Sequence, residues 1–349
     1  MIRPMIEQAC HTAFAPAARM VEDGTIPCAA LGMVTAAGAS AVTIAGMAAL
    51  EPERDRLTRD HWFDLASLTK VIATTNMVLQ LAEEGRLDLD RPLTDAIPDL
   101  RQYDVENAAE RQLTFRDCLL HRTFLPAVEP IYTYGDDPAR LRAFVLQREW
   151  RHGPPVYSDI NFILLGIAVE RITGAPLSER PLPPGLAYGP PPGPAVATEN
   201  CTWRGRVMQG EVHDENAYAL GGAAGHAGLF GTIDGVLGFA RALLAGELLS
   251  PAMMAQIRTA AYAHRTCGWE KAHPGWPGGS ACSPETIGHT GFTGTGLWLD
   301  FDRGLAWALL TNRVHPSRHG TQAIHALRQQ VSDAVIAAWE AQHSAAMHP

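Results

Sequence analysis

Apolar residues recur along the chain at two spacings, one typical of helices and one typical of strands. Helical spacing predicts helices near both ends of the chain and at two points between them. We expect these helices over 4–22, 67–84, 233–246 and 320–342. The second one follows a short strand pattern at 62–65, and Gly85 ends it as a C-terminal cap.

Strand patterns lie in two parts of the chain that are far apart in sequence. Residues 27–50 hold two β-branched segments around the small-residue stretch 36–40, which predicts a hairpin. Strand patterns return at 287–300 and 304–312. Residues 25–50 carry no charge, but the break at 36–40 argues against a membrane helix there.

The middle of the chain has a different pattern. From 87 to 173, proline-punctuated loops alternate with helical patterns, of which the clearest cover 141–146 and 161–172. Residues 181–194 hold seven prolines, which predicts a surface loop without regular structure. Strands and helices at both ends, with a helical insertion between them, predict an α+β fold. We expect an antiparallel sheet flanked by N- and C-terminal helices, plus an inserted helical lobe.

Composition narrows the functional class. The 349 residues carry a formal net charge of −9, and lysine and arginine are scattered, so we expect no nucleic-acid partner. The six cysteines form no C-x-x-C pair, which is typical of free thiols in a reducing compartment. No uninterrupted apolar segment lies near the N-terminus. We therefore expect a cytoplasmic protein without a membrane span, or a periplasmic one if a leader has been removed; its oligomeric state stays open.

The sharpest local signal is Ser67-Leu68-Thr69-Lys70, where a strand turns into a helix. There the Ser67 hydroxyl lies at the positive end of the helix dipole, and its N–H is an unsatisfied donor that can face an oxyanion. Lys70 lies one turn on and on the same face, within reach of the hydroxyl. The pattern is common by chance, so a plain helix cap and a solvated lysine remain an alternative.

A second candidate group is Tyr157-Ser158-Asp159, which precedes a helical pattern. A phenol must be activated to act as a base, and a nearby ammonium such as Lys70 would lower the pKa of Tyr157. In the alternative interpretation, Ser158 or Asp159 caps the helix and Tyr157 is a packing residue.

A third candidate is the Gly-rich strand edge Gly288-His289-Thr290-Gly291-Phe292-Thr293-Gly294. Glycines there let a ligand lie along the backbone, and the N–H after Gly291 is placed to be a second oxyanion donor. The alternative is a tight bulge in an inner strand.

The order of these groups resembles the serine β-lactamase-like hydrolases, which include class C β-lactamases, DD-peptidases and β-lactamase-fold esterases. Those proteins share S-x-x-K, then Y-x-N, then K-T-G or H-T-G, and the matching segments here are 67–70, 157–159 and 289–291. Residues 113–121 also look like the LTIRHLLTH segment of that family. The resemblance spans nearly the whole chain and implies a β-lactamase/transpeptidase-like fold.

The lobes of such a fold can be placed on this sequence. Residues 1–74 and 216–349 would form an α/β lobe around the antiparallel sheet, and residues 75–215 a mainly helical lobe. The active site would lie in the cleft between the lobes.

The resemblance also implies an acyl-transfer cycle without a cofactor or metal. Ser67 would be the nucleophile, and Lys70 and Tyr157 would move the protons, though the sequence leaves open which is the base in each step. The remaining motif residues would bind the substrate or the oxyanion, the latter through the N–H groups of Ser67 and Phe292. These binding residues are Asp159, His289, Thr290, Gly291 and Phe292.

Three departures from the family pattern argue against an efficient β-lactamase. Asp159 replaces an Asn, so an amide donor becomes an acceptor. His289 replaces a Lys and is largely neutral at pH 7, which makes it a poorer partner for a carboxylate until the pH falls toward 6. The HTSGL loop of the family is replaced by residues 121–125, which lack its Gly.

One further cluster, residues 211–216, contains His, Asp and Glu. Consecutive residues point in different directions and no H-E-x-x-H spacing occurs, so we expect no metal site. His226, between Gly225 and Ala227, is expected to be a structural turn residue.

The leading functional hypothesis is an esterase or amidase that acts on a small ester, a D-amino-acid amide or a peptidoglycan-derived amide. One alternative is a true β-lactamase or DD-peptidase. Another, from a different class, is a penicillin-binding sensor or scaffold that is acylated without turnover. The sequence leaves the substrate unnamed, because it does not reveal the shape of the acyl pocket.

Overall fold

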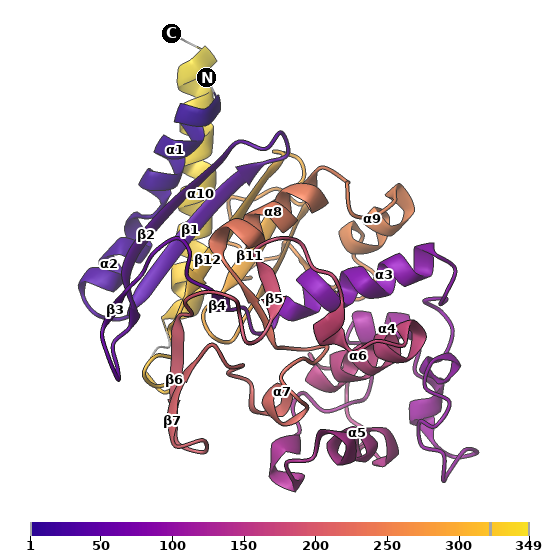
Figure 1. Cartoon of the computed structure of the whole chain (residues 1–349). Helices are drawn as coiled ribbons and strands as arrows, with labels where there is room; N and C mark the ends of the chain where they lie inside the picture. The colour runs from indigo at the N-terminus through magenta and orange to yellow at the C-terminus, as the bar shows by residue number, and fades with distance from the viewer. Residues whose placement is uncertain (1, 321–322, 348–349) are drawn as a thin grey trace.

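The structure, a computed structural model, describes residues 2–320 and 323–347. Its main sheet is built from β1 Cys28–Thr35, β2 Ser40–Ala49, β3 Asp55–Arg56, β9 Glu270–Lys271, β10 Thr286–Thr290, β11 Gly296–Asp300 and β12 Leu305–Thr311. The order is β3-β2-β1-β12-β11-β10-β9, and every pairing is antiparallel. Figure 1 labels β1, β2, β3, β11 and β12 of this sheet. Strands from the two ends of the chain therefore meet where β1 pairs with β12. The hairpin predicted over 27–50 is confirmed, whereas the pattern at 287–300 is two strands joined by a turn.

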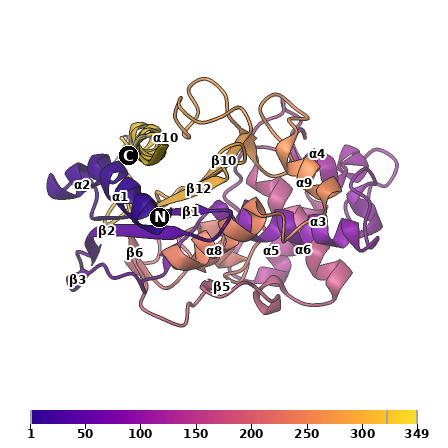
Figure 2. The same ribbon diagram turned by 90° about the horizontal axis from the view of Figure 1, so that it is seen from above.

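Helices from both chain ends cover one face of this sheet. They are α1 Ile2–Ala13, α2 Ala15–Glu22 and α10 Ile324–Met347, and α1 and α10 lie side by side over the strands (Figure 2). A core that includes Trp307 of β12 and Val331 of α10 fills the space between helices and sheet. The single helix predicted over 4–22 is wrong, because Pro16 in the first turn of α2 has no N–H to continue the α1 ladder. The start predicted at 320 for the last helix adjoins residues 321–322, which lie outside the described residues.

The opposite face of the sheet is covered by α8 Ile233–Leu244, as Figure 2 shows. Its Ile233 and Leu237 approach β1 at Gly32, where an added Cβ would lie 2.7 Å from a Leu237 methyl. The small residue thus sets how closely the helix packs. The larger of the two cores begins here and continues into the helical part of the chain.

Most of the remaining helices lie to one side of the sheet, where Figure 1 shows α3, α4, α5 and α6 together. They are α3 Thr75–Glu83, α4 Phe115–Leu119, α5 Pro138–Gln147, α6 Asp159–Thr173, α7 Glu215–Ala219 and α9 Pro251–Arg258. Short 3₁₀ turns lie at Leu93–Asp95, Ala109–Gln112, Ile131–Tyr134 and Leu177–Glu179. Together with the antiparallel sheets, they make the fold α+β. No helix within residues 2–320 and 323–347 combines the length and apolar character needed to cross a bilayer.

Two small sheets connect the helical part to the main sheet. One contains β4 Phe63–Asp64, β8 Leu229–Gly231 and β5 Leu186–Tyr188, and the other β6 Ala197–Cys201 and β7 Arg206–Gln209. The prediction that 181–194 lacks regular structure is therefore wrong at β5. Leu186 and Tyr188 are buried against β8, and this three-residue stretch without proline is too short to reveal a period in the sequence.

Candidate active site

Ser67 lies directly after a strained turn that follows β4. Ala66 has φ +48°, a left-handed conformation that is unfavourable for a residue with a Cβ. The buried Asp64 carboxylate holds the turn, because it accepts the Ala66 N–H at 2.8 Å and the His213 N–H at 2.6 Å. Burial raises the pKa of Asp64 above its ordinary value. The turn thus places Ser67 at the start of a helix and on the wall of a cleft.

The helix predicted over 67–84 does not begin as a regular α-helix. Its first part, Lys70–Thr74, is one π-helical turn, and α3 continues from Thr75. The Asn76 amide donates to the carbonyls of Val71 and Ile72 at 2.6 and 3.1 Å, so side-chain donors satisfy oxygens in the widened turn. Isolated π turns inside helices are frequent at functional sites.

Lys70 is fully buried, and its ammonium contacts three oxygens besides the hydroxyl of Tyr157. Nζ lies 3.0 Å from Ser67 Oγ, 3.1 Å from the His226 carbonyl oxygen and 2.8 Å from Asp159 Oδ1. Asp159 and Lys70 thus form a close ion pair. Burial alone would lower the pKa of Lys70, but Asp159 and Tyr157 outweigh it and raise this pKa above its ordinary value. Lys70 is therefore a cation at neutral pH.

Tyr157 packs over this cation. The Lys70 Nζ atom lies 5.1 Å from the centre of its ring, and the ring centre of His121 lies 4.4 Å from that of Tyr157. Burial raises the pKa of Tyr157, and the opposing effect of Lys70 is smaller. Lys70 does lower the pKa of Tyr157, as expected, but loss of hydration dominates and the net shift is upward.

Asp159 is the first residue of α6, and its carboxylate turns toward Lys70. Ser158 occupies the capping position without a side-chain cap, because its hydroxyl donates to the Pro126 carbonyl at 2.6 Å. The Ser158 N–H instead donates to Nδ1 of His121 at 3.0 Å. The replaced HTSGL segment therefore supplies a buried histidine that supports the Tyr157–Asp159 stretch.

The turn after β10 is fastened to the loop that carries Ser67. Thr293 Oγ1 donates to the Asp64 carbonyl at 2.8 Å, and Thr295 Oγ1 donates to the Leu65 carbonyl at 3.1 Å. Within the described ranges, the N–H groups of Ser67 and Phe292 have no protein acceptor, and both residues line the same cleft. This is the arrangement expected of two oxyanion donors.

His289, on β10, is buried and lies 5.8 Å from the Tyr157 ring, measured between ring centres. Burial, together with the charges of Lys70 and Arg265, lowers the pKa of His289 to about 3. Its Nδ1 lies 3.0 Å from the Thr290 carbonyl, so this nitrogen carries the proton of the neutral ring. The expectation that His289 gains charge toward pH 6 is therefore wrong.

The cleft has a volume of about 570 Å³ and joins Ser67, Tyr157, Asp159 and His289. Four arginines that the motif analysis did not single out also line it: Arg265, Arg313, Arg318 and Arg328. Arg265 stacks over Tyr157 at 5.3 Å from the ring centre, and no carboxylate among the described residues forms an ion pair with it. Arg265 thus places in the cleft a positive charge that the neutral His289 does not provide. Arg265 lies 24 positions before His289, so no local motif connects the two.

The acidic cluster at 211–216 spreads its side chains among different partners. His213 and Glu215 contact Arg318, whereas Asp214 accepts from His226 at 2.9 Å. Within the part of the chain that the structure describes, no three metal-ligating side chains converge. His226 joins this cluster to Lys70 through its carbonyl oxygen.

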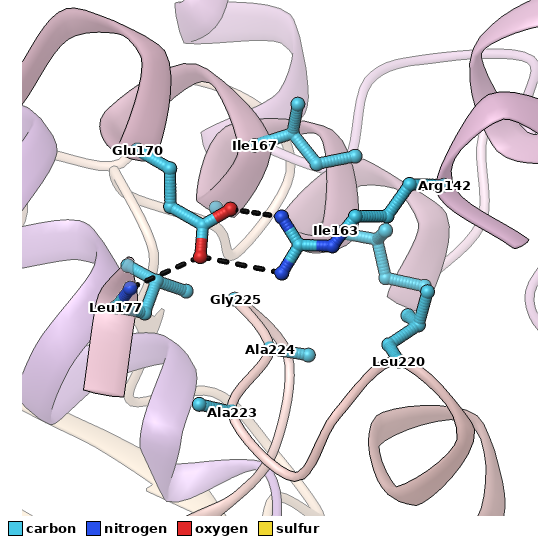
Figure 3. A pocket seen from close by; sticks show the side chains of 10 residues that line it. Arg142, Ile163, Ile167, Glu170, Leu177, Leu220, Ala223, Ala224 and Gly225 are labelled. Atoms are coloured by element: carbon cyan, nitrogen blue, oxygen red, sulfur yellow. Dashed lines mark hydrogen bonds and ion pairs between the residues drawn. The ribbon is translucent and has the colours of Figure 1, made fainter. Parts of the chain in front are cut away.

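A second, small pocket is lined in part by residues 223–225, which directly precede His226. An ion pair of Arg142 with Glu170 and the N–H of Leu177 close its rim (Figure 3). On its floor, Gly225 lies so close to Gly166 that a Cβ on either would clash with the backbone of the other. The volume of the pocket is only about 10 Å³, roughly that of one water. It is therefore too small for a substrate, and its residues help to position the active site.

Comparison with known proteins agrees with this geometry. The Beta-lactamase family model matches residues 17–332. The chain belongs to the beta-lactamase family. Two family relatives are a protein of Escherichia coli K12 provisionally named D-alanyl-D-alanine carboxypeptidase and the N-acetylmuramyl-L-alanine amidase of Bacillus subtilis 168. The first is 29% identical over 74% of this chain and 71% of its own, and the second 30% identical over 72% and 68%.

The fold of this family member is also found in solved structures. A beta-lactamase from Sulfitobacter sp. EE-36 superposes with a TM-score of 0.73, covering 96% of this chain and 98% of that one at 22% identity. The predicted β-lactamase/transpeptidase-like fold is thereby confirmed, and the protein is a serine hydrolase.

Proposed function

We propose that this hydrolase cleaves a small ester or amide through an acyl-enzyme formed on Ser67. The observation that carries the proposal is the 3.0 Å contact between Ser67 Oγ and Lys70 Nζ. It lies beside two backbone N–H groups, of Ser67 and Phe292, that have no acceptor among the described residues. A nucleophile, a proton carrier and a pair of oxyanion donors are the parts that acyl transfer requires.

The proposed cycle has two halves. Ser67 Oγ attacks the substrate carbonyl, the N–H pair stabilises the oxyanion, and a proton from Lys70 or Tyr157 reaches the leaving group as it departs. Water then attacks the acyl-enzyme and restores Ser67. Asp159, His289, Thr290, Gly291 and Phe292 line the substrate's path in this proposal, as the motif order predicts.

The cleft volume suits a small substrate, because ligand pockets commonly measure 300–1,000 Å³. Among the candidates, the printed name of the Bacillus subtilis relative favours a peptidoglycan-derived amide, whereas that of the Escherichia coli relative favours a DD-peptidase. A β-lactamase or DD-peptidase activity is the second candidate, and Arg265 is the observation that favours it. Its guanidinium could pair with the carboxylate of such substrates.

A side-by-side substrate panel tests the proposal. We would measure kcat/KM of the wild type and Ser67→Ala for p-nitrophenyl butyrate, D-alanyl p-nitroanilide and nitrocefin. The proposal expects ester or anilide turnover that Ser67→Ala abolishes. Nitrocefin turnover above both others would favour the β-lactamase. Acylation of Ser67 without turnover of any substrate would contradict the proposal and favour a sensor.

A further inference from the structure

The resting site holds more proton donors than acceptors. Lys70 is an ammonium that donates to Ser67 Oγ and to the His226 carbonyl oxygen, so its nitrogen has no lone pair for the serine proton. Tyr157 is a phenol, because burial raises its pKa. If Ser67 is the nucleophile proposed above, its proton therefore needs another destination.

Asp159 offers that destination. Its Oδ1 atom is fully buried and lies 2.8 Å from Lys70 Nζ, which is hydrogen-bond distance. A proton can therefore pass directly between these two atoms. An ionised carboxylate also cannot donate to a substrate carbonyl, which is what the family's Asn does at this position.

We propose that Asp159 is the terminal proton acceptor of a Ser67–Lys70–Asp159 relay. First, the N–H bond of Lys70 that faces Asp159 breaks and an O–H bond forms on Asp159 Oδ1, which leaves a lone pair on Lys70 Nζ. The amine then turns this lone pair toward Ser67. As the Ser67 oxygen bonds to the substrate carbonyl carbon, its O–H bond breaks and an N–H bond forms on Lys70 Nζ. Collapse of the intermediate reverses this path, and the proton leaves on the alcohol or amine. Hydrolysis repeats both steps with water in the place of Ser67.

The titratable groups around Lys70 and Asp159 should not set the pH dependence of the rate, because of the states in which the site holds them. Lys70 faces Tyr157, His121, His289 and Asp214, and Arg265 lies beyond them. Burial keeps both histidines neutral at and above pH 6, since it lowers the pKa of each, and Asp214 is paired with His226. Replacement of Asp159 removes the charge that holds Lys70 protonated, so burial then lowers the pKa of Lys70.

The relay thus predicts a displaced pH profile in Asp159→Asn. In the wild type, Lys70 passes its proton to Asp159 within the pair and needs no prior loss of a proton to solvent, so we expect a flat rate from about pH 6 to 9. In the variant, Lys70 must itself be neutral to accept the Ser67 proton, so the rate rises with pH. We expect kcat/KM for p-nitrophenyl butyrate to fall about 100-fold at pH 6 and to recover to within about 10-fold at pH 9, as loss of a positioned proton carrier implies.

Fluorophosphonate labelling of Ser67, followed by mass spectrometry across the same pH range, gives a second readout that needs no turnover. Glu270→Gln is the matched control, because Glu270 lines the same cleft but pairs with His273 at 2.9 Å. Its rate should stay flat from about pH 6 to 9, like that of the wild type, whatever its size. An Asp159→Asn profile that is scaled down uniformly would overturn the relay and leave Asp159 as a binding residue. Wild-type labelling without hydrolysis of any substrate would refute the proposed function alone, and no labelling at any pH would refute both.

Discussion

Gly291 lies so close to Leu65 that a Cβ on the glycine would sit 2.6 Å from the Leu65 carbonyl oxygen. This approach brings the loop before Ser67 against the turn after β10, and the Thr293 and Thr295 hydroxyls fasten the two segments. The spacing of the two proposed oxyanion donors therefore depends on the absence of a single side chain.

Gly291→Ala should separate the two loops and misplace one N–H group. We expect kcat/KM for p-nitrophenyl butyrate to fall about 100-fold, the usual effect of losing one oxyanion donor. Gly238→Ala is the control, because Gly238 is exposed on α8 with open space around its Cα. That change should leave the rate unchanged and stabilise the fold by about 0.5–1 kcal/mol. Full activity in Gly291→Ala would show that the contact does not set the donor geometry.

Lys70 and Asp159 should also be coupled in stability. Lys70→Met leaves a buried carboxylate oxygen without its cation, so we expect the free energy of unfolding in urea to drop by about 3–5 kcal/mol. Adding Asp159→Asn should recover a large part of that loss. Lys271→Met, which breaks a half-buried pair with Glu285, should lower stability by only about 1 kcal/mol. Additive effects of Lys70→Met and Asp159→Asn would contradict a tight ion pair.

The folded protein should lose stability in acid partly through His289. Its pKa is about 3 in the folded chain against an ordinary 6.5, so between these values the unfolded chain binds a proton that the folded chain does not. The free energy of unfolding should therefore fall as the pH falls from 6.5 toward 3, by up to about 1.4 kcal/mol per pH unit for this group. Denaturant melts of His289→Asn should show a shallower slope than the wild type. The same change at His319, an exposed histidine, should not alter the slope.

The fold was predictable from sequence where a pattern is long and local. The hairpin of β1 and β2 repeats its apolar pattern over two strands, and α8 keeps a helical period over twelve residues. Apolar residues at helical spacing predict one helix over 4–22, although Pro16 marks the break between α1 and α2. β5 was hidden among prolines, because three residues cannot show a period.

The site was predictable only where its residues lie in motifs. Ser67, Tyr157 and His289 come from three segments whose order resembles the family, and the structure brings them into one cleft. The left-handed Ala66 and the π turn after Ser67 depend on contacts with distant segments, such as the Asp64–His213 bond. The low pKa of His289 could not be foreseen either, because burial and the distant charge of Arg265 produce it.

The most direct test of the account is whether Ser67 carries the acyl group. We would mix the protein with p-nitrophenyl butyrate, quench with acid within milliseconds to seconds, and map the butyryl group by peptide mass spectrometry. The account predicts a butyryl group on the peptide that contains Ser67, at Ser67 itself, and none in a Ser67→Ala variant that stays folded by circular dichroism. A butyryl group on another residue, or undiminished ester hydrolysis by Ser67→Ala, would contradict it.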